Sequence, residues 1–135
     1  MKKLNVLLFF LAAFIANVAF AQTNISCYHR DVCLWNDDSK DFDDCEGYDE
    51  NSLFVINAAE TMFEHTTPTM SSAYFIKEKV QDPETGVWML SVTSDVGNEY
   101  LYFLDFEADE IRIAAETSGE MVMIMFKIKK TWSKE

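Results

Sequence analysis

The sequence has few of the residues on which most enzyme sites are built. It contains only two histidines, His29 and His65, so any general-base role would fall to one of them. It has no Gly-x-Ser-x-Gly motif and no glycine-rich phosphate loop, and the spacing of Cys27, His29 and Cys33 matches no standard zinc pattern. These absences argue against the common hydrolase, nucleotide-binding and zinc-enzyme classes. If the protein is an enzyme at all, it is one of an unrecognised type.

Basic residues are also scarce. There are 11 Lys and Arg against 23 Asp and Glu, a formal net charge of −12. Such a surface repels phosphate backbones and anionic lipid heads, which excludes nucleic acid as a natural partner. A basic protein, a cation or a neutral ligand fits this charge, although the charge also serves simply to keep a protein soluble.

The N-terminus reads as a cleavable signal peptide over residues 1–21. Lys2 and Lys3 precede an apolar run from Leu4 to Phe20, and Ala19-Phe20-Ala21 supplies the small-x-small cleavage pattern. We therefore expect an exported protein, periplasmic or extracellular, with a single β-rich domain at 22–135 and no stable membrane insertion after cleavage. Loss of two lysines would leave nine basic against 23 acidic residues, a net charge of −14.

Three cysteines, an odd number, leave one thiol without an intramolecular partner. In an oxidising compartment one disulfide is expected. On a strand, Cys27 and Cys33 would lie roughly 20 Å apart, beyond the Cα separation of about 7 Å that a disulfide tolerates. Cys45 therefore pairs with Cys33 or Cys27. We favour Cys33–Cys45, with Cys27 as the alternative partner or the free thiol.

Glycine and proline are rare as well, with four and two residues, and all six fall in segments that we read as loops or turns. Short apolar or β-branched segments recur between these turns, which is typical of an antiparallel meander. Both faces of the later segments are partly apolar, which favours a sheet curved onto itself. We predict an all-β fold with seven or eight strands, a small closed or half-closed up-and-down barrel that resembles the lipocalins in architecture. The expected strands are 28–35, 53–56, 61–66, 73–80, 87–93, 99–106, 111–115 and 121–130.

Two segments carry alternatives. Residues 52–65 could form a short helix, but their β-branched and aromatic content favours two strands joined at 57–60. Residues 36–50 read as a long acidic loop, with eight acidic residues against Lys40. A nonstandard Ca²⁺ site at Asp37, Asp41, Asp43 and Asp44 is conceivable, but the EF-hand pattern fails and a solvated loop is the better interpretation.

Met121, Met123 and Met125 alternate along the last predicted strand and would share one face. Soft thioethers select Cu(I), and this spacing resembles the Met-x-Met sites of small periplasmic copper-binding barrels. Nothing else along the chain supports that resemblance. Methionine is also a common gap-filler of cores and pockets, and packing is the preferred interpretation.

These features favour a non-enzymatic binding protein. It would hold an apolar small molecule in the barrel or a basic protein on its acidic surface. Alternatives are an inhibitor or immunity-type protein that docks through the acidic loop, and a Cu(I)- or Ca²⁺-binding protein. The residues that we expect to line a ligand cavity are His65, Trp88, Tyr100, Tyr102 and Met123.

Overall fold

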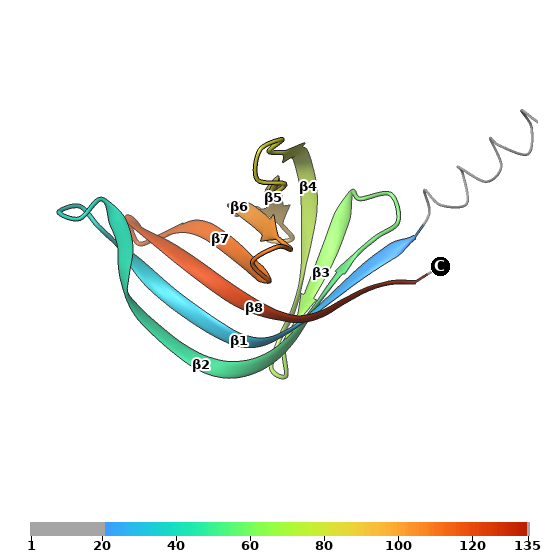
Figure 1. The fold of residues 1–135 in the computed structure, drawn as a ribbon, viewed down its shortest axis with the longest axis horizontal. Helices are drawn as coiled ribbons and strands as arrows, with labels where there is room; N and C mark the ends of the chain where they lie inside the picture. The colour runs from blue at the N-terminus through green and yellow to red at the C-terminus, as the bar shows by residue number, and fades with distance from the viewer. Residues whose placement is uncertain (1–20, 135) are drawn as a thin grey trace, which may run out of the picture.

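The computed structural model describes residues 21–134, where the chain forms eight β-strands and no helix. Each strand pairs antiparallel with its neighbours in chain order, and the first pairs with the last to close a barrel (Figure 1). This confirms the predicted all-β up-and-down barrel. The strands are β1 (Gln22–Asn36), β2 (Asp41–Ile56), β3 (Met62–Thr66), β4 (Ser71–Gln81), β5 (Trp88–Ser94), β6 (Glu99–Asp105), β7 (Glu110–Thr117) and β8 (Glu120–Lys134).

The predicted signal peptide lies outside the described residues, apart from Ala21. Within residues 21–134 no helix has the length and apolarity needed to cross a membrane. The start of β1 and the end of β8 lie side by side, paired from Gln22 and Lys134 onward.

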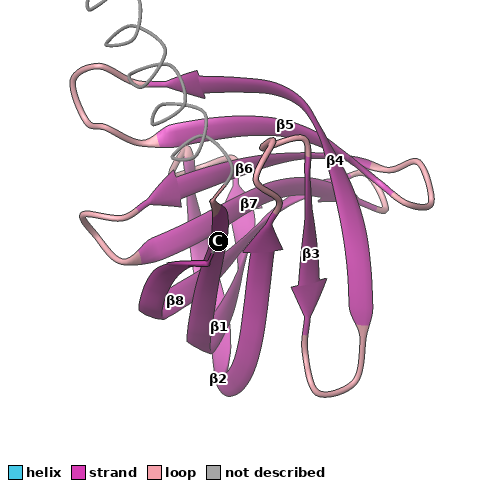
Figure 2. Ribbon diagram, turned by 90° about the vertical axis from the view of Figure 1, so that its right-hand side faces the viewer, coloured by secondary structure: helices cyan, strands magenta, loops and turns pink. Residues whose placement is uncertain are grey.

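The antiparallel order gives the barrel two distinct ends, which Figure 2 shows from the side. The first, which we call the hairpin end, carries the turns at 37–40, 67–70, 95–98 and 118–119. The second, the termini end, carries the turns at 57–61, 82–87 and 106–109 together with both ends of the described chain.

The core is built from the inward-facing residues of every strand. Burial alternates along β5, β6 and β7, as expected where one face of a strand packs inside and the other faces out. On β5, Leu90 and Val92 belong to the core, and Trp88 packs against it from the same face. Most of the buried apolar side chains form one cluster: Ile25, Cys27, Phe54, Phe63, Leu90, Val92, Tyr102, Leu104, Ile111, Ile113, Phe126 and Ile128.

The preferred interpretation of residues 52–65 as two strands is confirmed, and the helix alternative is wrong. The turn between β2 and β3 is held by Asn57, whose Oδ1 accepts from the backbone N–H of Thr61 and of Met62 at 2.8 and 3.2 Å. An asparagine that binds the backbone a few residues ahead favours a turn over a helix. Glu60 completes the turn with a φ of 56°.

The expected loop at 36–50 is instead mostly strand. Only residues 37–40 form a turn, and β2 starts at Asp41. Asn36 Oδ1 accepts from the N–H of Asp38 and Ser39, and Lys40 N–H donates to Asn36 C=O at 2.9 Å. This tight turn pairs the acidic segment with β1, so residues 41–50 become strand despite a composition that disfavours strands.

We call residues 32–50 the acidic arm, because they carry those eight acidic side chains and project past the rest of the barrel (Figure 1). The arm consists of the distal parts of β1 and β2 and their turn. β8 pairs along its β1 side, with Ile124 opposite Val32 and Val122 opposite Leu34. The arm is therefore an extension of the barrel wall and not a separate loop.

Candidate functional site

The predicted ligand-lining residues do not form one cavity. His65 and Tyr102 are enclosed in the barrel, and Trp88 and Tyr100 pack against the same core. Met123 alternates with the inward-facing Ile124 and Phe126, which places it on the outer face of β8. Its inclusion in the predicted set was therefore wrong, because the strand period of two points it away from the interior.

Aromatic side chains fill the middle of the barrel. The ring centroid of Phe63 lies 5.0 Å from that of Tyr102 and 5.1 Å from that of Tyr74, and Phe54 lies 5.3 Å from Phe126. The enclosed space left between them is about 10 Å³. That holds about one water molecule, whereas small-molecule pockets measure roughly 300–1,000 Å³. The middle of the barrel is therefore a packed core without room for a small-molecule ligand.

A polar cluster lies inside the barrel toward the hairpin end. Arg30 on β1 approaches Glu50 on β2, with 3.7 Å between Nη1 and Oε1. The Arg30 guanidinium carbon lies 6.0 Å from the ring centre of Tyr48 and 5.6 Å from that of Phe126, within the range of cation–π contacts. Arg30 Nε and Glu50 Oε1 have no hydrogen-bond partner within the described residues.

His65 borders this cluster and is only 5 % exposed. Its ring stacks on Phe54 at 4.0 Å and meets Phe126 edge-on at 5.0 Å. Burial, and secondly the charge of Arg30, lower the pKa of His65 to about 4. The imidazole is therefore neutral near pH 7. It acts as part of the core wall, and no nucleophile is hydrogen-bonded to it in the described residues.

The other histidine lies on the outer face at the base of the arm. His29 Nδ1 is 2.9 Å from Asp49 Oδ1, and Nε2 is 3.2 Å from Asp31 Oδ1. These two carboxylates, Asp49 first, raise the pKa of His29. The i, i+2 spacing of His29 and Asp31 on a strand was a signal for this contact, but the place of Asp49 depends on a register that sequence does not reveal.

Gly47 makes room for this network. A β-carbon at Gly47 would meet Asp31 Oδ1 and would lie 2.8 Å from His29 Nε2. The sequence predicts a loop around this glycine, but Gly47 lies within β2, opposite Asp31. It is the one glycine of the four without a positive φ. Its role is a close side-chain approach and not a turn.

The predicted metal ligands are not gathered into a metal site. Among residues 21–134, no three His, Cys, Asp or Glu side chains converge in an arrangement that could hold a metal ion. Asp43, one of the four proposed Ca²⁺ ligands with Asp37, Asp41 and Asp44, instead accepts hydrogen bonds from Asn36 Nδ2 and Ser39 Oγ at 3.0 and 3.3 Å. The carboxylates of this segment therefore accept hydrogen bonds within the turn or face the solvent.

The three methionines proposed as Cu(I) ligands are not placed in a suitable site either. Met121, Met123 and Met125 lie on the outer face of β8, and Met125 is opposite Arg112. A guanidinium next to the thioethers disfavours a bound cation. His65 is inside the barrel, and both ring nitrogens of His29 are within hydrogen-bond distance of carboxylates. Neither histidine is placed to complete the site.

The arm is stiffened by the Cys33–Cys45 disulfide, which confirms the favoured pairing. Cys27 is the free thiol; it is enclosed in the core, and burial raises its pKa to about 12. Near the arm's tip, Trp35 and Phe42 pack edge-to-face with 5.1 Å between ring centroids. Tyr48 is 51 % exposed. The arm thus combines acidic groups with exposed aromatic surface, a combination that depends on the strand pairing and is not evident from the sequence.

One edge of the arm has no neighbouring strand. β3 pairs only with Leu53–Ile56 of β2, whereas β1 pairs with β2 along nearly its whole length. Residues 41–52 therefore have a strand partner on one side only, within the described part of the chain. Such an edge exposes backbone N–H and C=O groups that another strand can bind.

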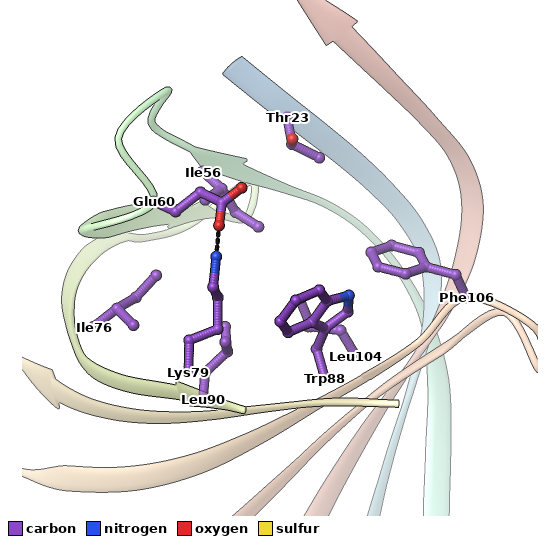
Figure 3. A pocket seen from close by; sticks show the side chains of 9 residues that line it. All are labelled: Thr23, Ile56, Glu60, Ile76, Lys79, Trp88, Leu90, Leu104 and Phe106. Carbon is purple, nitrogen blue, oxygen red and sulfur yellow. Dashed lines mark ion pairs between the residues drawn. The ribbon is translucent and has the colours of Figure 1, made fainter. Parts of the chain in front are cut away.

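A pocket of about 150 Å³ opens at the termini end (Figure 3). An ion pair between Lys79 and Glu60 lies at its rim, and Lys79 Nζ sits 5.0 Å from the ring centre of Trp88. Trp88 is the only predicted ligand-lining residue that reaches it. The lining residues are Thr23, Ile56, Glu60, Ile76, Lys79, Trp88, Leu90, Leu104 and Phe106.

The comparisons with known proteins give no relative. No protein-family model matches the chain, and neither a curated protein nor a solved structure matches it. The fold and the local geometry are therefore the only basis for a functional argument.

Proposed function

We propose that this chain is an exported, non-enzymatic binding protein that docks a basic protein partner on its acidic arm. The observation that carries the proposal is the edge of β2 at residues 41–52, which is acidic and has no strand partner on its β3 side within the described residues. The partner would contribute an extended segment rich in Lys and Arg. The Cys33–Cys45 disulfide and the lack of a membrane-spanning helix in residues 21–134 are compatible with export.

Strand addition suits this edge for a physical reason. A strand that pairs with an exposed edge gains main-chain hydrogen bonds, and side chains at alternate positions set its specificity. The carboxylates along the edge repel another copy of this acidic chain, so self-association is disfavoured. A basic segment meets the opposite effect, since it is attracted by the same charges.

Exposed apolar side chains on the arm support a docking role. Tyr48 and Trp35 are both well exposed although their neighbours are charged. Aromatic residues within a polar surround are typical of the few positions that dominate binding energy in protein interfaces. The disulfide holds the arm in place, which reduces the entropy lost on binding.

If docking on the arm blocks the activity of the partner, the chain is an inhibitor or immunity-type protein. The version with an apolar ligand enclosed in the barrel is less well supported, because the enclosed space is about 10 Å³. In the described residues the Ca²⁺ version lacks a converging set of carboxylates, and the Cu(I) version has Arg112 opposite Met125. The arm therefore carries the proposal.

Three synthetic decapeptides test it: alternating Lys–Val, alternating Glu–Val and alternating Lys–Pro. We expect the Lys–Val peptide to bind at low salt, to weaken several-fold at high salt, and to slow amide hydrogen exchange within residues 41–52. The Lys–Pro peptide keeps the charge, but proline at every second position removes half of the backbone N–H donors and favours a polyproline II conformation over a β-strand, so at least tenfold weaker binding is expected. Equal binding of Lys–Pro would reject strand addition, and no binding of Lys–Val would reject the proposal.

Matched variants locate the site. Asp38→Asn, Asp44→Asn and Glu46→Gln together remove three arm charges at exposed positions. Glu84→Gln, Asp95→Asn and Glu107→Gln remove three charges from turns outside the arm. The first set should weaken the Lys–Val peptide more than the second. Equal losses would show attraction by net charge alone and would contradict docking on the arm.

A further inference from the structure

The pocket at the termini end differs from the barrel interior in being open and mostly apolar. Its walls come from β1, β2, β4, β5 and β6, so strands distant in sequence form it jointly. Ile56, Leu90 and Leu104 supply aliphatic surface, and Trp88 and Phe106 supply rings. Figure 3 shows these side chains around the Lys79–Glu60 pair.

We propose that this pocket is a binding site for an uncharged, single-ring aromatic molecule that carries a hydroxyl group, that is, a simple phenol. The site is separate from the arm, which lies at the other end of the barrel. The proposal therefore goes beyond protein docking and does not depend on it.

Size selects one ring. A cavity of about 150 Å³ lined by aliphatic and aromatic side chains is known to take up benzene and to stay dry when empty. The pocket here measures about 150 Å³, with mainly aliphatic and aromatic walls. A steroid, a fatty acid or a two-ring ligand would exceed it. Aromatic walls favour a planar ring, because offset or edge-on ring contacts add to the energy of burial.

The rim selects a neutral hydroxyl group. Lys79 and Glu60 present an ammonium donor and a carboxylate acceptor next to each other. A hydroxyl group can accept from Lys79 and donate to Glu60 at once. A carboxylate on the ligand would be repelled by Glu60, and an ammonium by Lys79. Thr23 adds a further hydroxyl at the β1 side of the rim.

The lysine also shields part of the apolar wall of the pocket. Lys79 covers the face of Trp88 while its ammonium group remains paired with Glu60. Long lysine side chains commonly lie along apolar surface with the charged head in water. A phenol can therefore enter beside this side chain without the ion pair having to break.

Side-chain NMR of ¹⁵N-labelled tryptophan tests the site directly. The chain has three indole N–H groups, on Trp35, Trp88 and Trp132, and only Trp88 lines the pocket. On titration with phenol we expect a saturable shift of the Trp88 signal and no saturable shift of the other two. Benzoate, with the same ring and a negative charge, should bind at least tenfold more weakly. Three signals that shift together without saturation would overturn the proposal, as would equal affinity for benzoate.

Two substitutions on β6 separate the pocket from the surface. Leu104→Phe adds volume inside the pocket and should weaken phenol at least tenfold, whereas Leu101→Phe, at a half-buried position outside the pocket lining, should leave the affinity unchanged. If Leu104→Phe does not fold, Thr23→Leu narrows the rim from β1 and should give the same loss. Unchanged phenol affinity in a folded pocket variant would contradict the proposal.

Discussion

The acidic arm and the closed part of the barrel belong to the same sheet but depend on different forces. In the closed part, rings from β2, β3, β4, β6 and β8 pack against one another and leave almost no space. In the arm, one disulfide, a tight turn and strand pairing on the β1 side hold an acidic hairpin in place. The comparison suggests that the barrel supplies rigidity while its ends carry the surfaces available for binding.

The largest expected effect is the loss of unfolding free energy when a packed ring is removed, and it should differ between the closed part and the arm. Phe63→Ala removes a ring enclosed by Phe54, Tyr74 and Tyr102, and large-to-small changes of this kind cost about 3–5 kcal/mol. Phe42→Ala removes a ring near the tip of the arm, where we expect a loss within about 1 kcal/mol. Urea unfolding measures both free energies. Similar losses would mean that the arm is part of the cooperative core.

A second difference concerns the cross-link. The Cys33–Cys45 disulfide has a sequence separation of 12, and closing such a loop contributes about 3 kcal/mol in the chain-entropy model. Cys33→Ala with Cys45→Ala should lower the unfolding free energy by about that amount. Amide exchange should quicken first within residues 32–50, while β5 and β6 stay protected.

Cys27→Ala is the matched control for that experiment. It removes the third cysteine, a buried free thiol, without opening a cross-link. Its loss should be smaller than that of the double substitution, and no faster exchange in the arm is expected. Faster exchange throughout the barrel in the double variant would contradict the separation of the two regions.

The sequence allowed the closed part to be predicted much better than the arm. Alternating residues such as Leu90, Val92 and Tyr102 identify strands and the residues that share a face without knowledge of the register, because a period of two is a local property. The cysteine pairing could be narrowed for a similar reason, since distance along a strand excludes Cys27–Cys33.

The arm and the pocket could not be predicted in the same way. Asp, Asn and Gly are depleted in strands, so residues 36–50 read as a loop, and only the pairing with β1 makes them a strand. Gly47 read as a loop residue for the same reason. The Lys79–Glu60 contact joins β4 to the turn before β3, and a contact of this kind depends on the register in which β3 and β4 pair.

The two histidines extend the comparison to pH. His65 has a folded pKa near 4, below its ordinary value of 6.5, so the unfolded chain binds a proton that the folded chain does not. Stability should therefore fall by about 2–3 kcal/mol as the pH drops from 6.5 to 4. In His65→Phe this contribution should disappear from the pH dependence of the unfolding free energy.

His29, at the base of the arm, should act with the opposite sign. Asp49 and Asp31 raise its pKa, so its stabilising contribution is complete below pH 6.5 and is lost as the pH rises through the folded pKa. Unfolding measured against pH for His29→Gln should show that this contribution is gone. Identical pH profiles for His29→Gln and His65→Phe would contradict the assignment of one histidine to the interior and the other to the surface.

The smallest expected effect tests why β2 has a glycine in the arm. A methyl group at Gly47 would overlap Asp31 Oδ1 and press on His29, while the backbone there is compatible with alanine. In Gly47→Ala, Asp31 should therefore swing away from His29, and the pKa of His29 should fall toward 6.5 with little change in overall stability. NMR titration of the imidazole C–H signals measures this pKa. Asp31→Asn removes the same charge without adding volume and should lower the pKa in the same direction. If Asp31→Asn lowers it and Gly47→Ala does not, the space over Gly47 is not what holds Asp31 against His29.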